Sequence, residues 1–326
     1  MYRVIDLHCD TIPNMYSDFR EGKEASLLSN SGRIDLNRMR EGGYICQCFS
    51  LFTHLGALKK RGESPFTHVL GLVDFWKTQI AEYPDIIGQV TTAESMEENA
   101  RMGKLSAMMT VEEGGVYEGK LENLYALYDK GVRMSTLTWN FANELGYPNP
   151  AIAPGSPRIP DMVNGLTDTG KSFVEEMERI GILIDVSHLN DAGIRDIFEL
   201  THGPVIASHS NARTLCSHLR NLSDNNIRMI GERGGINYFV GFLEDGGKIG
   251  RIEKMVEHMQ YIKNLAGIDA IALGSDFDGF GELCELSGAE KMQQLASEME
   301  RQGFSSAEID KVFSLNALRV FRSVLS

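Results

Sequence analysis

The sequence has little of what marks secreted or membrane-spanning chains. Its five cysteines are few for 326 residues, odd in number and widely scattered, so no disulfide framework is indicated. No run approaches the roughly 20 apolar residues that a membrane-crossing helix needs. The first residues, Met1–Asp6, contain no basic segment leading into an apolar stretch, as a secretory signal would. We therefore expect a cytoplasmic protein without a membrane partner.

Basic residues are also scarce relative to acidic ones. The chain has 32 Lys and Arg against 45 Asp and Glu, a formal net charge of −13. A negative chain repels polyanions, which argues against nucleic acid as a partner. The charge leaves the substrate open, because a metal site can be locally positive inside an acidic protein.

The chain does contain a regular alternation of short apolar runs and amphipathic stretches. The apolar runs are Val4–Asp10, Tyr44–Thr53, Ser106–Glu112, Val132–Thr138, Leu183–His188, Pro204–Ser210, Gly235–Val240 and Ala270–Asp278. The helical stretches include Phe66–Glu82, Leu121–Lys130, Thr169–Ile180, Ile249–Leu265, Ala289–Gln302 and Ser306–Leu325. Such alternation predicts parallel strands covered by helices. Eight runs favour one α/β domain over residues 1–326, a (β/α)₈ TIM barrel, with an open doubly wound sheet as the alternative.

Two segments depart from this alternation. Asn14–Arg40 has weak periodicity, and we interpret it as an insertion after the first strand that contributes to a lid. Glu144–Val163 contains five of the nine prolines, which predicts a long, stiffened connection after the fourth strand.

Residue types that bind metals follow five of the apolar runs, where each strand gives way to a loop. They occur in His8-Cys9-Asp10, Glu112-Glu113-Gly114-Gly115, Ser187-His188, Ser208-His209-Ser210 and Asp276-Phe277-Asp278-Gly279. In a barrel the carboxyl ends of all strands meet at one mouth, so these side chains should converge. Imidazole nitrogen and carboxylate oxygen suit Zn²⁺, and no pair of cysteines is spaced as a thiolate site.

A two-metal site is consistent with this arrangement. His8 and Asp10 lie two apart on a strand, so both can face one ion. A glutamate after the third run would bridge that ion to a second one held by His188 and His209. Two such ions would share a hydroxide, lower its pKa and polarise an amide carbonyl.

Each motif also has a purely structural interpretation. A His-x-Asp pair arises easily by chance, and His188 or His209 alone fits a hydrogen-bonded core histidine. Glu112 and Glu113 fit the start of a helix, and the segment from Asp276 fits a turn. Their joint placement at one end of the predicted sheet favours the metal site.

Five motifs, in order over nearly the whole chain, resemble the membrane (renal) dipeptidase family, in particular its soluble bacterial members. They are Ile5-Asp6-Leu7-His8-Cys9-Asp10-Thr11, Gly165-Leu166-Thr167-Asp168-Thr169-Gly170, Ile184-Asp185-Val186-Ser187-His188, Pro204-Val205-Ile206-Ala207-Ser208-His209-Ser210 and Gly274-Ser275-Asp276-Phe277-Asp278-Gly279. The resemblance implies a (β/α)₈ barrel holding two zinc ions. It also implies a dipeptide substrate hydrolysed through a metal-bridging hydroxide.

The resemblance further implies roles for the metal ligands. His8 and Asp10 would bind one zinc ion, and His188 and His209 the other. The bridging carboxylate is ambiguous, because this chain has two adjacent glutamates where one is usual. Keeping the Val-Glu step of the motif favours Glu112, and keeping Glu-Gly-Gly favours Glu113; we choose Glu112.

Three further residues follow from the resemblance as substrate contacts. Asp276 matches the family's acid/base residue, which also holds the substrate amine. Arg220 matches an arginine for the substrate carboxylate, which a guanidinium binds with two parallel hydrogen bonds. Trp139 stands where animal members have a substrate-contacting histidine, so that role does not transfer. Asn140 would donate a hydrogen bond instead, and Trp139 would fill an apolar wall.

The sequence therefore predicts a metallo-dipeptidase and leaves two alternatives open. One is a related two-metal enzyme acting on a cyclic amide, lactam or ester. The other is a catalytically silent metal-binding protein, to which Trp139 is the only pointer. The oligomeric state stays open, with a homodimer as the candidate assembly. The native metal and the acceptance of D-residues stay open as well.

Overall fold

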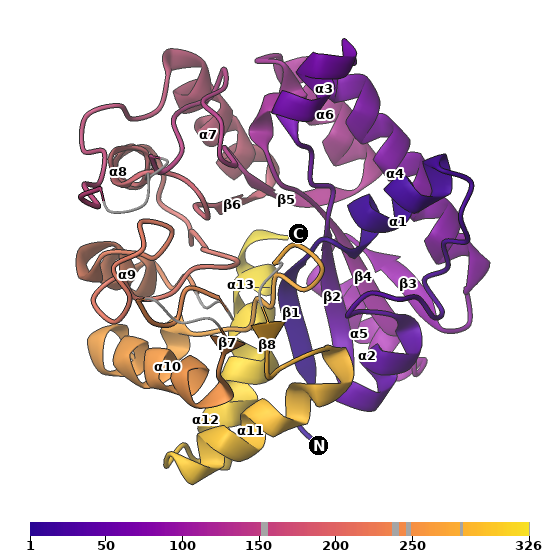
Figure 1. The fold of residues 1–326 in the computed structure, drawn as a ribbon, viewed down its shortest axis with the longest axis vertical. Coiled ribbons are helices and arrows are strands. Elements are labelled where there is room, and N and C mark those ends of the chain that lie inside the picture. Colours follow the sequence, from indigo (N-terminus) through magenta and orange to yellow (C-terminus); the bar gives the residue numbers. More distant parts are fainter. Residues whose placement is uncertain (151–155, 237–240, 246–248, 281–282, 326) are drawn as a thin grey trace.

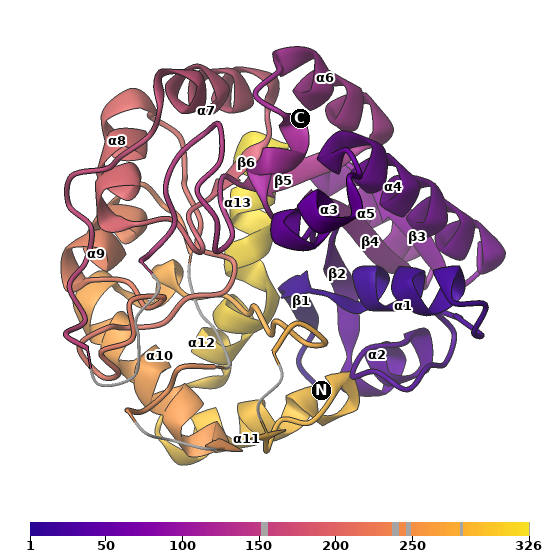
Figure 2. The ribbon, with the colours of Figure 1, turned by 45° about the horizontal axis from the view of Figure 1, so that its top comes forward.

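The computed structural model describes residues 1–150, 156–236, 241–245, 249–280 and 283–325. Parallel strands form its centre, and helices surround them (Figures 1 and 2). The strands pair in the order β1-β2-β4-β5-β6, and β3 pairs with β4. Their bounds are β1 (Val4–Cys9), β2 (Tyr44–Ser50), β3 (Ile87–Val90), β4 (Leu105–Val111), β5 (Val132–Thr136) and β6 (Leu183–Asp185). A short pair, β7 (Ile249–Gly250) and β8 (Leu283–Cys284), lies outside this sheet.

Beyond β6 the sheet continues as extended backbone joined by single bridges. Asp185 bridges to Ile206, and the Ala207 amide donates to the Ile236 carbonyl. From the other edge, Asp6 of β1 bridges to Leu273. These pairings curl the sheet into the α/β barrel that the alternating pattern predicts.

Carboxylates explain why the later predicted runs do not become full strands. The Asp185 carboxylate accepts from the Ser208 amide at 3.0 Å, and the Asp6 carboxylate accepts from the Ser275 amide at 2.8 Å. Side-chain oxygens thus take backbone donors that a regular ladder would pair with carbonyls. The predicted run Gly235–Val240 lies largely at 237–240, outside the described residues.

The helices lie around the sheet. Within the described residues, seven of them begin at a Ser, Thr, Asp or Asn whose side chain caps the first turn: α2, α4, α5, α7, α8, α9 and α12. Their bounds are α1 (Thr11–Arg20), α2 (Leu36–Gly42), α3 (Leu55–Arg61), α4 (Pro65–Glu82), α5 (Ala93–Arg101), α6 (Leu121–Lys130), α7 (Asp168–Ile180), α8 (Asp191–Leu200), α9 (Asp224–Glu232), α10 (Ile252–Ala266), α11 (Met292–Arg301), α12 (Ser306–Asp310) and α13 (Asn316–Val324). No helix of the part of the chain described here is long and apolar enough to span a bilayer.

The segment Asn14–Arg40, which we expected to be an irregular insertion after the first strand, is partly helical. It contains most of α1 and the start of α2, and α1 packs against α4 and β2. The periodicity is weak because α1 buries only three side chains, Thr11, Ile12 and Met15.

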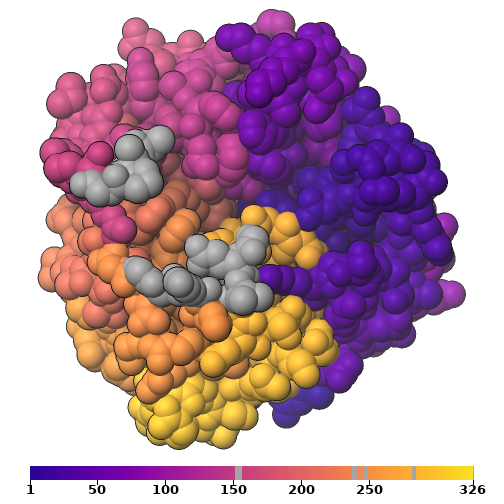
Figure 3. Space-filling model, viewed as in Figure 1, coloured from indigo at the N-terminus to yellow at the C-terminus, as the bar shows by residue number. Residues whose placement is uncertain are grey.

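The barrel interior forms its own apolar core, which α13 closes at the amino-terminal end of the strands. Ala317, Val320 and Phe321 of α13 are buried in the same cluster as Ile5 of β1 and Met108 of β4. The first and last parts of the chain consequently lie side by side (Figure 3), and the Tyr2 and Phe313 rings are 5.7 Å apart. The opposite, carboxyl end of the strands is where the polar side chains gather.

Candidate active site

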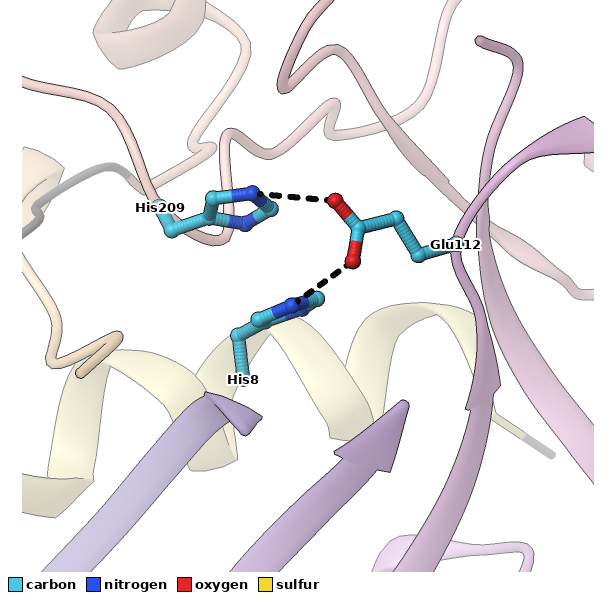
Figure 4. Close-up of side chains that lie close together, drawn as sticks. All are labelled: His8, Glu112 and His209. Atoms are coloured by element: carbon cyan, nitrogen blue, oxygen red, sulfur yellow. Dashed lines mark ion pairs between the residues drawn. The ribbon is translucent and has the colours of Figure 1, made fainter. Parts of the chain in front are cut away.

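Glu112 lies at the centre of the polar cluster, directly after β4. Its Oε2 is 3.1 Å from Nε2 of His8, which belongs to β1. Its Oε1 is 2.9 Å from Nε2 of His188 and 3.5 Å from Nε2 of His209. Figure 4 shows the rings of His8 and His209 facing different oxygens of the same carboxylate. Glu112 thus separates two groups of possible metal ligands while touching both.

The first group surrounds Nε2 of His8. Oδ1 of Asp10 lies 3.7 Å from this nitrogen, and Oδ1 of Asp276 lies 3.6 Å from it. Apart from the ion pair between His8 and Glu112, three buried atoms of the group have no hydrogen-bond partner within the described part of the chain: His8 Nε2, Asp10 Oδ1 and Glu112 Oε2. Buried polar atoms are normally satisfied, so converging orphans of this kind fit a metal ion.

The second group joins the two later histidines. Nε2 of His188 and Nε2 of His209 are 3.0 Å apart, and both face Oε1 of Glu112. Burial, reinforced by the positive charge of Arg220, lowers the pKa of His188 to about 3. Burial and the nearby His8 hold the pKa of His209 well below its usual value. Both rings are therefore neutral at physiological pH, which is the form that binds metals.

The carboxylates around His8 perturb one another strongly. Burial favours a neutral His8 ring, but Glu112, Asp10 and Asp276 outweigh it and raise the pKa of His8 to about 10. Burial raises the pKa of Asp276 to about 7; His8 opposes this rise and Glu112 adds to it. A carboxyl group with a pKa near neutrality can both accept and release a proton, as an acid/base residue must.

The adjacent Glu113 has a different environment. Its backbone is left-handed, with φ of 87°, and its carboxylate turns away to accept from the amides of Gly115 at 2.9 Å and Trp139 at 3.1 Å. The Asn143 amide group also donates to it. Of the two candidates for the bridging position, only Glu112 faces His8, His188 and His209.

Left-handed backbone conformations concentrate at this end of the barrel. Among the described residues, six non-glycine residues have positive φ, and four of them lie in the predicted motifs: Glu113, His188, Asp276 and Asp278. Such conformations cost free energy and persist where surrounding structure fixes them, commonly at functional sites.

Side chains without an assigned role in the sequence motifs form hydrogen bonds around the predicted ligands. The Ser208 hydroxyl donates to Asp185 and lies 2.7 Å from Nδ1 of His209, so it can accept that ring's N–H. The Asp278 carboxylate accepts from the Thr11 hydroxyl at 2.6 Å and from the Arg33 amide at 2.7 Å. In the sequence, the feature that could have indicated such supporting groups is a carboxylate inside an otherwise apolar run, as at Asp6 and Asp185.

A cavity of about 420 Å³ opens over the two ligand groups. It is lined by the predicted site residues Asp10, Glu112, Trp139, Asn140, His188, Arg220 and Asp276, together with Phe52, Asn149, Pro150, His218, Leu219, Phe242, Gly279 and Phe280. Arg220 is buried, and its guanidinium donates to the Ser210 hydroxyl at 3.2 Å and to the His209 carbonyl at 3.1 Å. Burial lowers the pKa of Arg220 to about 10, which still leaves it charged at neutral pH.

Trp139 forms part of an aromatic wall of this cavity. Its ring lies 4.9 Å from Phe52, 5.2 Å from His54 and 5.6 Å from Phe141, measured between ring centroids. Beside it, Oδ1 of Asn140 is 3.1 Å from Nδ1 of His188. Besides Trp139, six of the predicted site residues thus line one cavity, and the other two, His8 and His209, lie behind this lining, next to Glu112.

Comparison with known proteins agrees with this geometry. A family model described as membrane dipeptidase, peptidase family M19, matches residues 1–326. The chain belongs to this family. Membership makes it a metallo-dipeptidase, so the family that the motifs resemble is confirmed.

The chain is also similar to three known proteins. The "Uncharacterized protein in pqqA 5'region" of Klebsiella pneumoniae is 34% identical over 234 residues, which cover 70% of this chain and 85% of that protein. Dipeptidase 3 of Rattus norvegicus is 28% identical over 297 residues, covering 90% of this chain but only 59% of the rat protein. A solved metallo peptidase from Rhodobacter sphaeroides, liganded with a phosphinate mimic of the dipeptide L-Ala-D-Ala, shares the fold. It has a TM-score of 0.88 at 22% identity, and the match covers 99% of both chains.

Proposed function

We propose that this M19 protein is a zinc-dependent dipeptidase that uses two zinc ions. His8 and Asp10 would hold one ion, His188 and His209 the other, and Glu112 would bridge them. The observation that carries this proposal is the position of Glu112, whose two oxygens face separate histidine groups at 3.1 Å and 2.9 Å. The nitrogen and oxygen donors match the ligand preference of Zn²⁺.

When bound, two zinc ions supply an acidified water and polarise the scissile carbonyl. The protein's own groups would do the rest. Asp276, whose buried carboxyl has a raised pKa, would take a proton at Oδ1 and release it to the leaving amine. The same carboxylate would hold the substrate ammonium. The phosphinate mimic of a dipeptide bound to the Rhodobacter sphaeroides relative supports a dipeptide as substrate.

Arg220 would fix the free carboxylate at the end of the dipeptide. Its guanidinium lines the cavity and is oriented by Ser210 and the His209 carbonyl, so little conformational freedom is lost when an anion binds. Asn140 also lines the cavity, and its amide NH₂ would donate a hydrogen bond to the substrate. The apolar wall of Phe52 and Trp139 would contact a substrate side chain.

Metal analysis combined with a substrate panel tests this function. The purified protein should contain two equivalents of zinc and hydrolyse dipeptides, among them L-Ala-L-Ala and L-Ala-D-Ala. The same dipeptides with an amidated C-terminus should lose most of their kcat/KM, since Arg220 then has no carboxylate to bind. Equal turnover of the amidated forms, or a preference for cyclic amides, lactams or esters, would contradict the dipeptidase assignment. A content of one ion or none would contradict the two-metal site.

A further inference from the structure

The imidazole ring of His188 is held from the cavity side by a single amide. Its Nδ1 lies 3.1 Å from Oδ1 of Asn140, and its Nε2 faces Glu112 at 2.9 Å. An amide oxygen only accepts hydrogen bonds, so the proton of this contact belongs to Nδ1. A neutral ring with its proton on Nδ1 has its lone pair on Nε2, where Glu112 and His209 converge.

The backbone of His188 is fixed independently of this ring contact. The residue is left-handed, with φ of 70°, and its carbonyl accepts from the backbone amide of Asn149 at 2.8 Å and from the Asn149 side chain at 3.2 Å. These bonds position the main chain but do not select a ring tautomer. That selection falls to the group at Nδ1.

The ring of His209 is held at Nδ1 in a different way. Its Nδ1 meets the Ser208 hydroxyl at 2.7 Å, and this hydroxyl donates onward to the buried carboxylate of Asp185. His209 is thus supported by a chain of groups buried beneath the cavity. His188 has its Nδ1 support on the cavity side, because Asn140 is solvent-exposed and lines the cavity.

We propose that Asn140 is a positioning residue that holds His188 with its proton on Nδ1, so that Nε2 is presented to the metal. The inference rests on the proposed two-metal function and deepens it, since Asn140 then acts through His188 besides contacting substrate. Partners of this kind on ligating histidines fix tautomer and orientation, and losing one weakens metal binding about 10–100-fold.

Two substitutions of similar size separate this role from a merely structural one. Asn140→Asp keeps an oxygen acceptor for Nδ1–H, whereas Asn140→Leu removes it. Asn264→Leu, at an exposed position on α10, is the matched control. Each protein is loaded with zinc and the release of metal to an excess of chelator is followed by a zinc-sensitive dye.

We expect one of the two ions to leave the Asn140→Leu protein on the order of 10–100-fold faster than the wild type. Asn140→Asp should stay within about threefold of the wild type, as should Asn264→Leu. Acceleration in both Asn140 variants alike, or wild-type release from Asn140→Leu, overturns the inference. Thermal unfolding of each apoprotein checks that the fold is intact.

A second measurement reads the tautomer without metal. In ¹⁵N-histidine-labelled apoprotein at pH 7, the His188 ring, assigned with His188→Gln, should show its proton on Nδ1. The population of this tautomer should fall in Asn140→Leu and persist in Asn140→Asp. An unchanged tautomer in Asn140→Leu overturns the inference while leaving the proposed function standing if the wild type binds two ions and cleaves dipeptides. Absence of metal binding by the wild type would overturn both.

Discussion

Glu112 and Glu113 are neighbours in the sequence, but their carboxylates contact different groups at the end of β4. Oε1 of Glu112 lies 2.9 Å from Nε2 of His188, while Oε1 of Glu113 accepts from the Gly115 amide at 2.9 Å. The positive φ of Glu113 turns its side chain away from the histidines. This relationship predicts different consequences for two chemically identical substitutions.

Glu112→Gln should lower the metal content of the purified protein below two equivalents and abolish dipeptide turnover. An amide offers one acceptor oxygen where the carboxylate offers two, and it removes a negative charge between the ligand groups. Metal stoichiometry after dialysis and the rate of hydrolysis measure the effect. A Glu112→Gln protein that retains two ions and activity would falsify the bridging role.

Glu113→Gln is the matched control and should keep both metal ions. It replaces an acceptor of the Gly115 and Trp139 amides by a group that also donates, so one buried contact becomes unfavourable. We expect the free energy of unfolding to fall by about 1–3 kcal/mol. Denaturant unfolding checks this value, and loss of metal from Glu113→Gln would show that the two residues are not distinct.

Asp276→Asn should leave bound metal nearly unchanged and reduce kcat by a factor of about 10²–10⁴. The substitution keeps the shape of the side chain but removes the proton acceptor. Metal content and steady-state kinetics on one dipeptide measure the two effects together. If the variant keeps the wild-type kcat, Asp276 is not the acid/base residue.

Gly279→Ala should disturb the carboxylates of Asp10 and Asp276. A Cβ at this position would stand less than 3.0 Å from the Asp10 and Asp276 carboxylate oxygens. We expect at least a tenfold loss of kcat/KM with displaced or weakened metal, because one ångström of misplacement at a reacting centre can cost about 10²-fold. Gly203→Ala is the control, since its nearest neighbour there is the side chain of Glu178 at 3.3 Å. Normal activity of Gly279→Ala would mean that the backbone or the two carboxylates can shift to accommodate the added methyl group, which would contradict this prediction.

His258 should make the fold less stable as the pH falls. Its Nδ1 accepts from the Ala212 amide at 3.2 Å and its Nε2 lies 2.8 Å from the Leu243 carbonyl, a pattern that requires the neutral ring. Burial lowers the pKa of His258 below its ordinary value of 6.5. The stability that the neutral ring contributes is therefore complete above pH 6.5 and is lost as the pH falls toward the lowered pKa.

The pH dependence of unfolding tests this prediction. Between pH 7 and pH 5, His258 should contribute a loss of at most about 1.4 kcal/mol per pH unit to the free energy of unfolding. His258→Gln, which can make similar hydrogen bonds without titrating, should show a smaller slope than the wild type. Chelator is present in both samples, so that metal loss does not contribute. Equal slopes would assign the pH dependence to other groups.

The sequence predicted the strands best where a continuous apolar run ends in polar residues. The apolar runs at Val4–Asp10 and Ser106–Glu112 predict β1 and β4 to within one residue at each end, because buried parallel strands are apolar on both faces. β3 escaped prediction because Ile87–Val90 is only four residues long and contains Gly88 and Gln89. α1 escaped because few of its side chains are buried.

What the sequence by itself determined was the set of residue types at the strand ends and hence the family of this chain. The motifs can be recognised without knowledge of distances. Their side chains are expected to converge because the carboxyl ends of parallel strands share one edge. Only the tertiary structure decided which glutamate faces the histidines and which side chains support them. Those choices depend on the left-handed turn at Glu113 and on contacts such as Asn140 with His188, which join residues 48 positions apart and leave no periodic signal in the chain.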